Sequence, residues 1–227
     1  MEQRSVLPSG SAGFRPLTPD EVAARLAAAP RGGLRRSQDA AGRGDHDLNP
    51  GLFPDRPLVP AAVLVPLVVR PAGLTVLFTL RTAHLSDHAG QISFPGGRID
   101  PGDRDEREAA LRETREEIGL APANVRLIGR LDTYVTRTGF RVEPLVGLLA
   151  PPLDLQPDPR EVADIFEASL DFLIDPANRR RDSRIYEGSE RFYWAISWKG
   201  RYIWGATAGM LVNLADVLHG SAPDSIA

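Results

Sequence analysis

The sequence predicts an α/β domain in which helices are interspersed with the strands of a mixed β-sheet. Two runs rich in apolar and β-branched residues, 61–70 and 74–81, predict paired strands, and a run of helical character follows at 104–118. Further strand-like runs follow along the chain, and the last element is a helical run. The 227 residues, 42% hydrophobic and 25% charged, are enough for one globular domain with appendages.

The first fifty residues are predicted to contain one helix and a linker. Residues 17–29 favour a helix because Thr18 is a suitable N-cap and a proline follows at the first helical position. From 31 to 60 the chain is rich in Gly, Pro, Asp and Arg and poor in apolar residues, which indicates a loop or linker. We therefore expect an N-terminal helix with a flexible linker at 1–50 and a single domain at 51–227.

The later elements follow from local patterns. Pro71-Ala72-Gly73 predicts a hairpin turn between the first two strands, and Gly119 is a suitable C-cap for the helix at 104–118. Further strands are expected at 124–136, 141–149 and 162–169, then a short helix at 170–174, late strands at 183–186, 191–198 and 201–203, and a terminal helix at 206–218.

Composition excludes several kinds of chemistry. Without cysteine there is no disulfide, no thiolate nucleophile and no cysteine zinc site. The net charge of −3 gives no global footprint for nucleic acid, so we expect no nucleic-acid partner. Of the 27 Lys and Arg residues only Lys199 is a lysine, so a single arginine is weak evidence for a site.

We expect a cytoplasmic protein that does not associate with membranes. The longest apolar run, 58–69, is interrupted by two prolines and is shorter than the roughly 20 residues that span a bilayer. Neither a secretory signal nor a C-terminal retention address is visible. The oligomeric state is left open.

The strongest functional signal is Gly96-Gly97 followed, fourteen residues later, by an acidic helical segment that begins at Arg112. On a helix Glu113, Glu116 and Glu117 fall within about 100° of arc, so the three carboxylates share one face. Like charges at this spacing cost roughly 0.2–0.5 kcal/mol per pair in an isolated helix. Carboxylates beside a glycine-rich turn suit a hard cation such as Mg²⁺, with substrate phosphates completing the coordination.

The alternative interpretation is a solvated helix held by Glu–Arg ion pairs. Residues 104 and 108, 108 and 112, and 112 and 116 all have the i,i+4 spacing of such pairs. The glycine pair, the fixed distance and the Glu-x-x-Glu-Glu-x-Gly ending would then all have to coincide by chance, so we favour the metal site.

Residues 97–120 resemble the signature box of the Nudix hydrolases, Gly-x5-Glu-x7-Arg-Glu-U-x-Glu-Glu-x-Gly-U, in which U is apolar. The spacing to Arg112 is one residue longer than this pattern, the upstream acidic residue is Asp103, and Thr114 stands at an apolar position.

The preceding residues, 77–97, are similar to the motif of the coenzyme A pyrophosphatase subfamily. One difference is Ser86, where that motif commonly has an arginine. The two motifs together cover 77–120, about a fifth of the chain.

The resemblance implies a Nudix α/β/α sandwich that hydrolyses the pyrophosphate bond of coenzyme A or an acyl-coenzyme A with Mg²⁺ or Mn²⁺. The products would be 4′-phosphopantetheine and adenosine 3′,5′-bisphosphate. It also implies that Glu113, Glu116 and Glu117 are the metal ligands and that Arg112 orients them. A metal-activated water would attack phosphorus without a covalent intermediate.

Further candidates lie outside the box. We expect substrate-binding roles for Arg81, His84, Phe94, Gly96 and Gly97. A surface role for Arg81, and metal binding by His84 with His88, are the alternatives to substrate binding. Glu161 and Glu167 are weaker candidates for the base that deprotonates water. About half of the late aromatic residues are expected in the core, with one or two lining the pantetheine channel.

Two rival functions remain. A Nudix enzyme for ADP-ribose or a dinucleotide would share the box, but the upstream motif favours coenzyme A. A non-catalytic nucleotide-sensing module would share the fold, but it would gain nothing from three repelling carboxylates.

Overall fold

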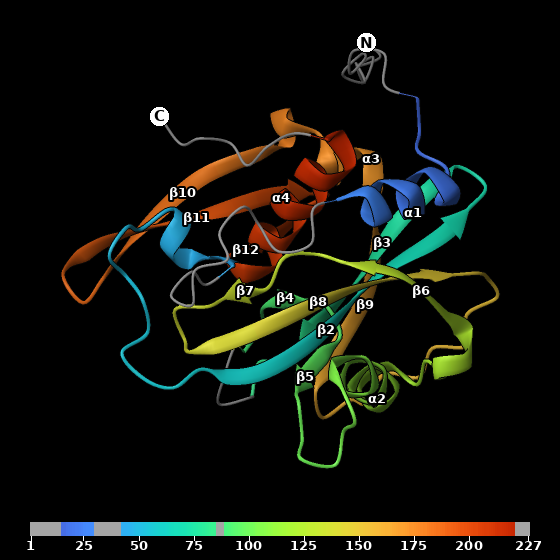
Figure 1. The fold of residues 1–227 in the computed structure, drawn as a ribbon, viewed down its shortest axis with the longest axis horizontal. Coiled ribbons are helices and arrows are strands. Elements are labelled where there is room, and N and C mark those ends of the chain that lie inside the picture. The colour runs from blue at the N-terminus through green and yellow to red at the C-terminus, as the bar shows by residue number, and fades with distance from the viewer. Residues whose placement is uncertain (1–14, 30–41, 85–88, 221–227) are drawn as a thin grey trace, which may run out of the picture.

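The computed structural model describes residues 15–29, 42–84 and 89–220, which form two β-sheets with helices around them (Figure 1). The helices are α1 (Pro19–Ala28), α2 (Glu106–Ile118), α3 (Leu170–Ile174) and α4 (Ala206–His219), with 3-10 turns η1 (Asp45–Asp47), η2 (Pro122–Asn124) and η3 (Pro176–Asn178). Every helix in this part of the chain is too short or too polar to cross a membrane.

The larger sheet is mixed, as predicted. Its strands within the described residues are β1 (Arg43–Gly44), β2 (Val59–Arg70), β3 (Gly73–Arg81), β4 (Ile92–Ser93), β5 (Gly96–Arg98), β6 (Val125–Arg130), β7 (Tyr134–Val135), β8 (Phe140–Leu149) and β9 (Val162–Ser169). At its centre β2 runs parallel to β8 and antiparallel to β3 and β5. The predicted hairpin is confirmed, with Arg70 paired to Gly73.

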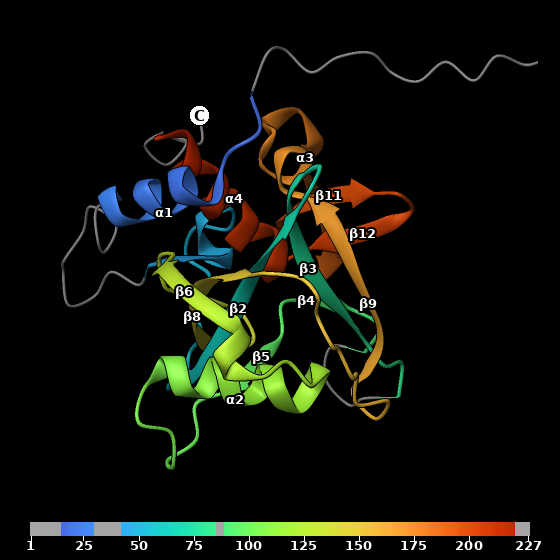
Figure 2. The same ribbon diagram turned by 90° about the vertical axis from the view of Figure 1, so that its right-hand side faces the viewer.

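The smaller sheet is antiparallel. It consists of β10 (Arg179–Tyr186), β11 (Ser189–Trp198) and β12 (Arg201–Trp204). In Figure 2, α2 covers one face of the larger sheet, while α1, α3, α4 and the smaller sheet lie on the other side. Alternate residues of β2 serve the two layers: Leu64 and Val68 join the core cluster of Ile118 in α2, and Ala61 and Val65 join the cluster that contains α4.

The strand predicted at 124–136 is wrong as a single element. It divides into β6 and β7 because the chain between them turns toward α4, where the Asn213 side-chain oxygen accepts a hydrogen bond from the Asp132 N–H at 2.9 Å. The predicted glycine-rich turn at Gly96-Gly97 is instead the strand β5, hydrogen-bonded to β2. The helix predicted from residue 104 begins at Glu106.

The N-terminal segment packs against the rest of the molecule. The predicted helix is confirmed as α1, and its Val22 and Leu26 are buried in the main core cluster. Part of the expected linker forms β1, which pairs with β7, while residues 30–41 lie outside the described residues. The boundary at residue 50 stays a prediction, although α1 and β1 both precede it.

Candidate active site

The acidic helix α2 is fixed at both ends and along one side. The Asp105 side chain caps the first turn by accepting from the N–H groups of Arg107 and Glu108, and Gly119 ends the helix with a φ of +73°. The side of the helix that packs on the sheet is fully buried and carries Ala110, Thr114 and Ile118. The acidic side is therefore turned toward β5 and solvent.

Arg112 holds the acidic side chains of this region together. Its guanidinium donates to both oxygens of Asp103 at 2.9 Å, to Glu113 at 2.9 Å and to Glu116 at 3.1 Å. Hydrogen bonding and charge from Arg112 hold the pKa of Asp103 below its usual value. The aspartate that departs from the Nudix pattern therefore still reaches the arginine. The expected pair of Arg104 with Glu108 also forms.

Glu113 and Glu117 lie against the backbone of β5. A Cβ added at Gly97 would stand 2.5 Å from the Glu113 carboxylate, so any larger residue there would displace that side chain. The N–H of Gly96 donates to Glu117 at 3.1 Å, and Arg81 from β3 contacts the same carboxylate at 3.3 Å. Two glycines, one arginine and two carboxylates thus meet at this point.

The negative charges of Glu113 and Glu117 are only partly compensated by their neighbours, because burial removes solvent from both carboxylates. Loss of solvation raises the pKa of Glu117 to about 7, although the Gly96 N–H and Arg81 favour its charged form. Burial also raises the pKa of Glu113, against the opposing effect of Arg112. Charge repulsion from Glu161 makes a small contribution to both increases, so this residue lies within electrostatic range of the pair.

The other acidic candidates differ in their surroundings. The Glu116 side chain is 52% exposed and is held by Arg112, nearer to solvent than the buried pair. Glu167 is bound by Arg70 at 2.6 Å and by Thr75, and these contacts outweigh burial and lower its pKa. Of the two candidate bases, Glu161 is the one whose charge acts on the acidic pair.

A cavity of about 480 Å³ lies on the other side of the Gly96–Gly97 strand. Its lining is rich in arginines and aromatic rings. The arginines are Arg81, Arg98, Arg137, Arg184 and Arg191, and the aromatic residues are Phe94, Phe140, Tyr186, Phe192, Tyr193 and Trp204. One carboxylate, Asp45, also lines it within the described residues. The cavity is therefore strongly cationic and offers ring faces, which suits an anionic nucleotide derivative.

Asp45 fixes one wall of the cavity. Its carboxylate accepts from the buried Tyr134 hydroxyl at 2.8 Å and from the Arg137 N–H at 2.7 Å. The Arg137 guanidinium in turn lies 3.9 Å from the centre of the Tyr186 ring in β10. This contact joins the smaller sheet to the turn after β7.

A model of the NUDIX domain matches residues 58–187. The chain belongs to the Nudix family. A protein named "Uncharacterized Nudix hydrolase NudL" from Pectobacterium atrosepticum is 38% identical over 177 residues, which cover 74% of this chain and 87% of that protein. Its namesake from Escherichia coli K12 is 40% identical over 157 residues, covering 68% and 80%. Among solved structures, an Ap4A hydrolase from C. elegans has 25% identity and a TM-score of 0.43, covering 49% of this chain and 80% of that one.

As a Nudix hydrolase the protein acts on nucleoside diphosphate derivatives, and the family generally uses divalent metal ions. Glu117, which is buried, and Glu113, which is partly buried, have raised pKa values and provide oxygen ligands whose charge the protein does not fully neutralise, which fits a hard cation. No three His, Asp or Glu side chains in the described ranges stand together as a ready-made metal site. Glu113 and Glu117 are therefore the residues that fit the cation, and a ligand role for Glu116 stays a prediction.

The remaining predicted residues have different positions in this Nudix domain. Phe94 is 3% exposed and its ring lies 5.3 Å from that of Phe78, so it belongs to the core at the edge of the cavity. His84 is exposed and is not among the cavity-lining residues, and His88 lies outside the described residues. Tyr193 and Trp204 line the cavity, whereas Trp194 and Trp198 pack against the core.

Sequence reasoning named Arg81 but missed Asp45 and the other arginines that shape the cavity. Asp45 falls in the predicted linker, and Arg184 and Arg191 come from strands of the second sheet. With arginine common throughout the chain, composition gives no signal for them. Only the pairing of β10 with β11 brings the last two together.

Proposed function

We propose that this Nudix hydrolase cleaves the pyrophosphate bond of coenzyme A or an acyl-coenzyme A, giving 4′-phosphopantetheine and adenosine 3′,5′-bisphosphate. The observation that carries the proposal is the position of the Glu113–Glu117 pair, separated from a cationic, aromatic cavity only by the glycine strand β5. The coenzyme A preference rests on the upstream motif at 77–97.

Each residue near the pair has a role in this proposal. Glu113 and Glu117, with Glu116, would hold Mg²⁺ or Mn²⁺, and that ion would neutralise the diphosphate and lower the pKa of a bound water. Arg81 offers a guanidinium to a phosphate oxygen, since its Nε is buried and has no hydrogen-bond partner among the described residues. Arg112 orients Glu113, and Glu161 is our candidate for the base that accepts the proton of the attacking water.

The test is hydrolysis of coenzyme A with Mg²⁺ or Mn²⁺, with and without a chelator. We expect the chelator to stop turnover, and Glu113→Gln and Glu117→Gln each to lower kcat by at least about 100-fold with the fold intact, as expected when a group that stabilises transition-state charge is removed. Glu106→Gln, at the start of α2 and paired with Arg130 instead, is the matched control and should retain activity. Wild-type rates in both site variants would disprove the assigned site.

Substrate choice is tested by comparing kcat/KM for coenzyme A, ADP-ribose and a dinucleotide. The proposal predicts the highest value for coenzyme A, and a preference for ADP-ribose would overturn it. Turnover in ¹⁸O-labelled water then shows which product carries the label, and so which phosphorus atom is attacked.

A further inference from the structure

The face of the smaller sheet that borders the cavity carries two arginines directly opposite each other. Arg184 in β10 pairs in register with Arg191 in β11, so their side chains project on the same side. Both line the cavity, together with Tyr186, Tyr193 and Trp204 from the same face. Arg191 also lies beyond residues 58–187, which the NUDIX domain model matches.

This arginine pair has no carboxylate to balance it in the described part of the chain. Arg184 contacts aromatic rings, lying 5.4 Å from the centre of Trp204, and the Nε of Arg191 is buried without a hydrogen-bond partner. Elsewhere on β10, Arg180 pairs with Asp182 at 2.9 Å and Arg179 with Asp216 at 3.5 Å, while Arg181 lies over the Phe192 ring. Like charges directly opposite each other destabilise a sheet, so an anion between them would relieve the repulsion.

The nearest acidic residue of the cavity does not supply that anion. The Asp45 carboxylate is already occupied by the Tyr134 hydroxyl and the Arg137 N–H. The first turn of α4, which carries no acidic residue, lines the cavity as well, so the helix terminus adds partial positive charge.

We propose that Arg184 and Arg191 form a second anion site that binds a phosphomonoester of the substrate, separate from the diphosphate that is cleaved. This inference rests on the proposed function, in which that group is the 3′-phosphate of coenzyme A. The pair then sets specificity: it favours substrates that carry this extra phosphate. Two charge-assisted donors recognise a phosphate dianion well, and a substrate without it leaves both guanidinium groups unpaired.

The experiment compares kcat/KM for coenzyme A and for dephospho-coenzyme A, which differ only in that phosphate. We expect the wild type to favour coenzyme A by about tenfold or more, which corresponds to about 1.4 kcal/mol. The double variant Arg184→Gln/Arg191→Gln should lower kcat/KM for coenzyme A alone and bring the ratio near one. Arg181→Gln is the matched control, because Arg181 lies on the same strand but on its opposite face, over Phe192.

Equal losses on both substrates, or an unchanged ratio, would overturn the inference. Arg191→Lys keeps the positive charge and should therefore retain part of the preference for coenzyme A. This variant distinguishes loss of the anion site from a simple failure to fold. A second measurement separates this inference from the proposed function: calorimetric binding of adenosine 3′,5′-bisphosphate against adenosine 5′-monophosphate. Even if coenzyme A is not hydrolysed, the anion site is supported when the wild type binds the bisphosphate more tightly than the monophosphate and the double variant does not. Equal binding of the two nucleotides by the wild type rejects the site.

Discussion

Glu117 is expected to make the metal-free protein less stable as the pH rises. The unfolded chain loses this proton near the ordinary pKa of 4.5, whereas burial raises the pKa in the folded protein to about 7. The stabilising effect of the bound proton is therefore complete below pH 4.5 and is lost as the pH rises through 7. Above that pH the ionised, buried carboxylate costs on the order of 3 kcal/mol.

Glu117→Gln removes this cost, so we expect the variant to be more stable than the wild type at pH 8 in a chelator, and to lose that advantage at pH 4.5. Urea unfolding at the two pH values measures the difference. Glu116→Gln is the control, since that side chain is half exposed on the same helix. If the Glu117→Gln advantage were the same at both pH values, the burial argument would be wrong.

The acidic residues of the site were predictable from helical spacing, but their separate roles were not. The spacing places Glu113, Glu116 and Glu117 on one face, yet only the strand β5 decides which of them are buried. The i,i+4 spacing predicts the pair of Arg112 with Glu116, but it does not indicate that this pair keeps Glu116 nearer to solvent. The chain before β9 returns to the end of β3, where the Thr82 N–H donates to the Glu161 carbonyl, and this brings Glu161 within electrostatic range of the pair.

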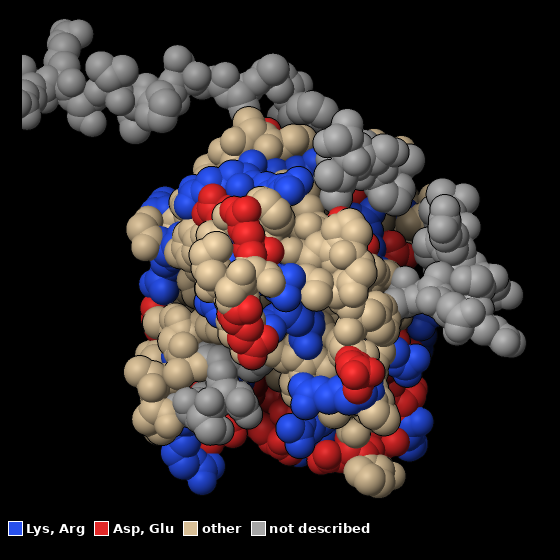
Figure 3. Space-filling model, turned by 90° about the vertical axis from the view of Figure 1, so that its left-hand side faces the viewer, with Lys and Arg blue, Asp and Glu red and all other residues tan. Residues whose placement is uncertain are grey.

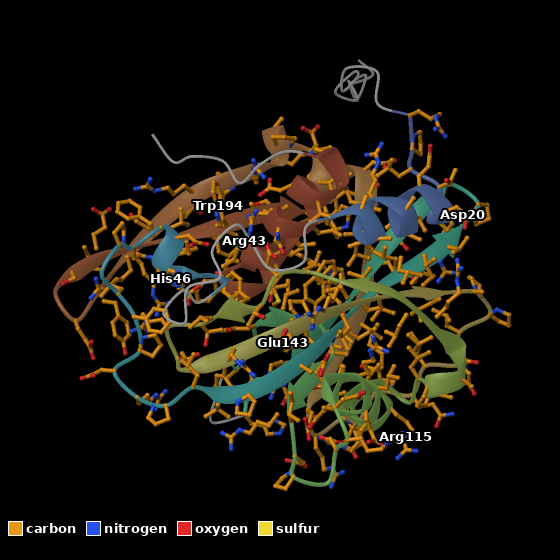
Figure 4. The ribbon with its side chains drawn as sticks, viewed as in Figure 1. Asp20, Arg43, His46, Arg115, Glu143 and Trp194 are labelled. Atoms are coloured by element: carbon orange, nitrogen blue, oxygen red, sulfur yellow. The ribbon has the colours of Figure 1, made fainter. Side chains whose placement is uncertain are left out.

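At the scale of elements, α4 is tied to both sheets through one buried carboxylate. Asp216 lies 2.7 Å from Arg43 of β1, a close ion pair that is not aligned as a hydrogen bond, and 3.5 Å from Arg179 of β10. Figure 4 shows Arg43 in the interior, between the larger sheet and β10–β12. The side chains of Asp216 and Arg43 are 7% and 17% exposed, so their charges are poorly solvated.

Asp216→Ala should lower the free energy of unfolding by about 3 kcal/mol, because it leaves buried arginines short of a counter-charge. Asp20→Ala is the matched control: Asp20 is 96% exposed, 4.0 Å from Arg126, and lies at the outer edge of α1 in Figure 4. We expect no measurable change for it in urea unfolding. Equal effects of the two substitutions would contradict the structural role of Asp216.

Elements with strong local signals were predicted well, and those defined by distant partners were not. The N-cap of α1 at Thr18 and the turn between β2 and β3 are local signals, and both appear where expected. By contrast β1 is two residues long and exists because it pairs with β7, more than eighty residues away. The break at Asp132 depends in the same way on Asn213 of α4.

On one broad face of the whole molecule, charge is mixed and not segregated. Figure 3 shows acidic and basic side chains interspersed across the face it presents, in line with the net charge of −3. The cationic cavity is therefore a local feature, and its attraction for an anionic substrate acts at short range.

The N-terminal helix is expected to stabilise the whole molecule without taking part in chemistry. Val22 and Leu26 of α1 are buried in the main core, a Cβ at Gly129 of β6 would stand 2.9 Å from Leu26, and Arg25 donates to the Leu218 carbonyl of α4. Removing residues 1–30 would uncover that core, whereas removing residues 1–14 leaves α1 in place.

We therefore expect the longer truncation to lower the melting temperature strongly and the shorter one to have little effect. Leu26→Ala, a smaller change, should cost about 2–3 kcal/mol in urea unfolding. Because none of the described residues 15–29 lines the cavity or contacts the acidic pair, kcat should stay close to that of the full chain wherever the protein is folded. A folded Leu26→Ala protein with normal stability but no hydrolysis would show that α1 acts on the chemical step, contrary to this prediction.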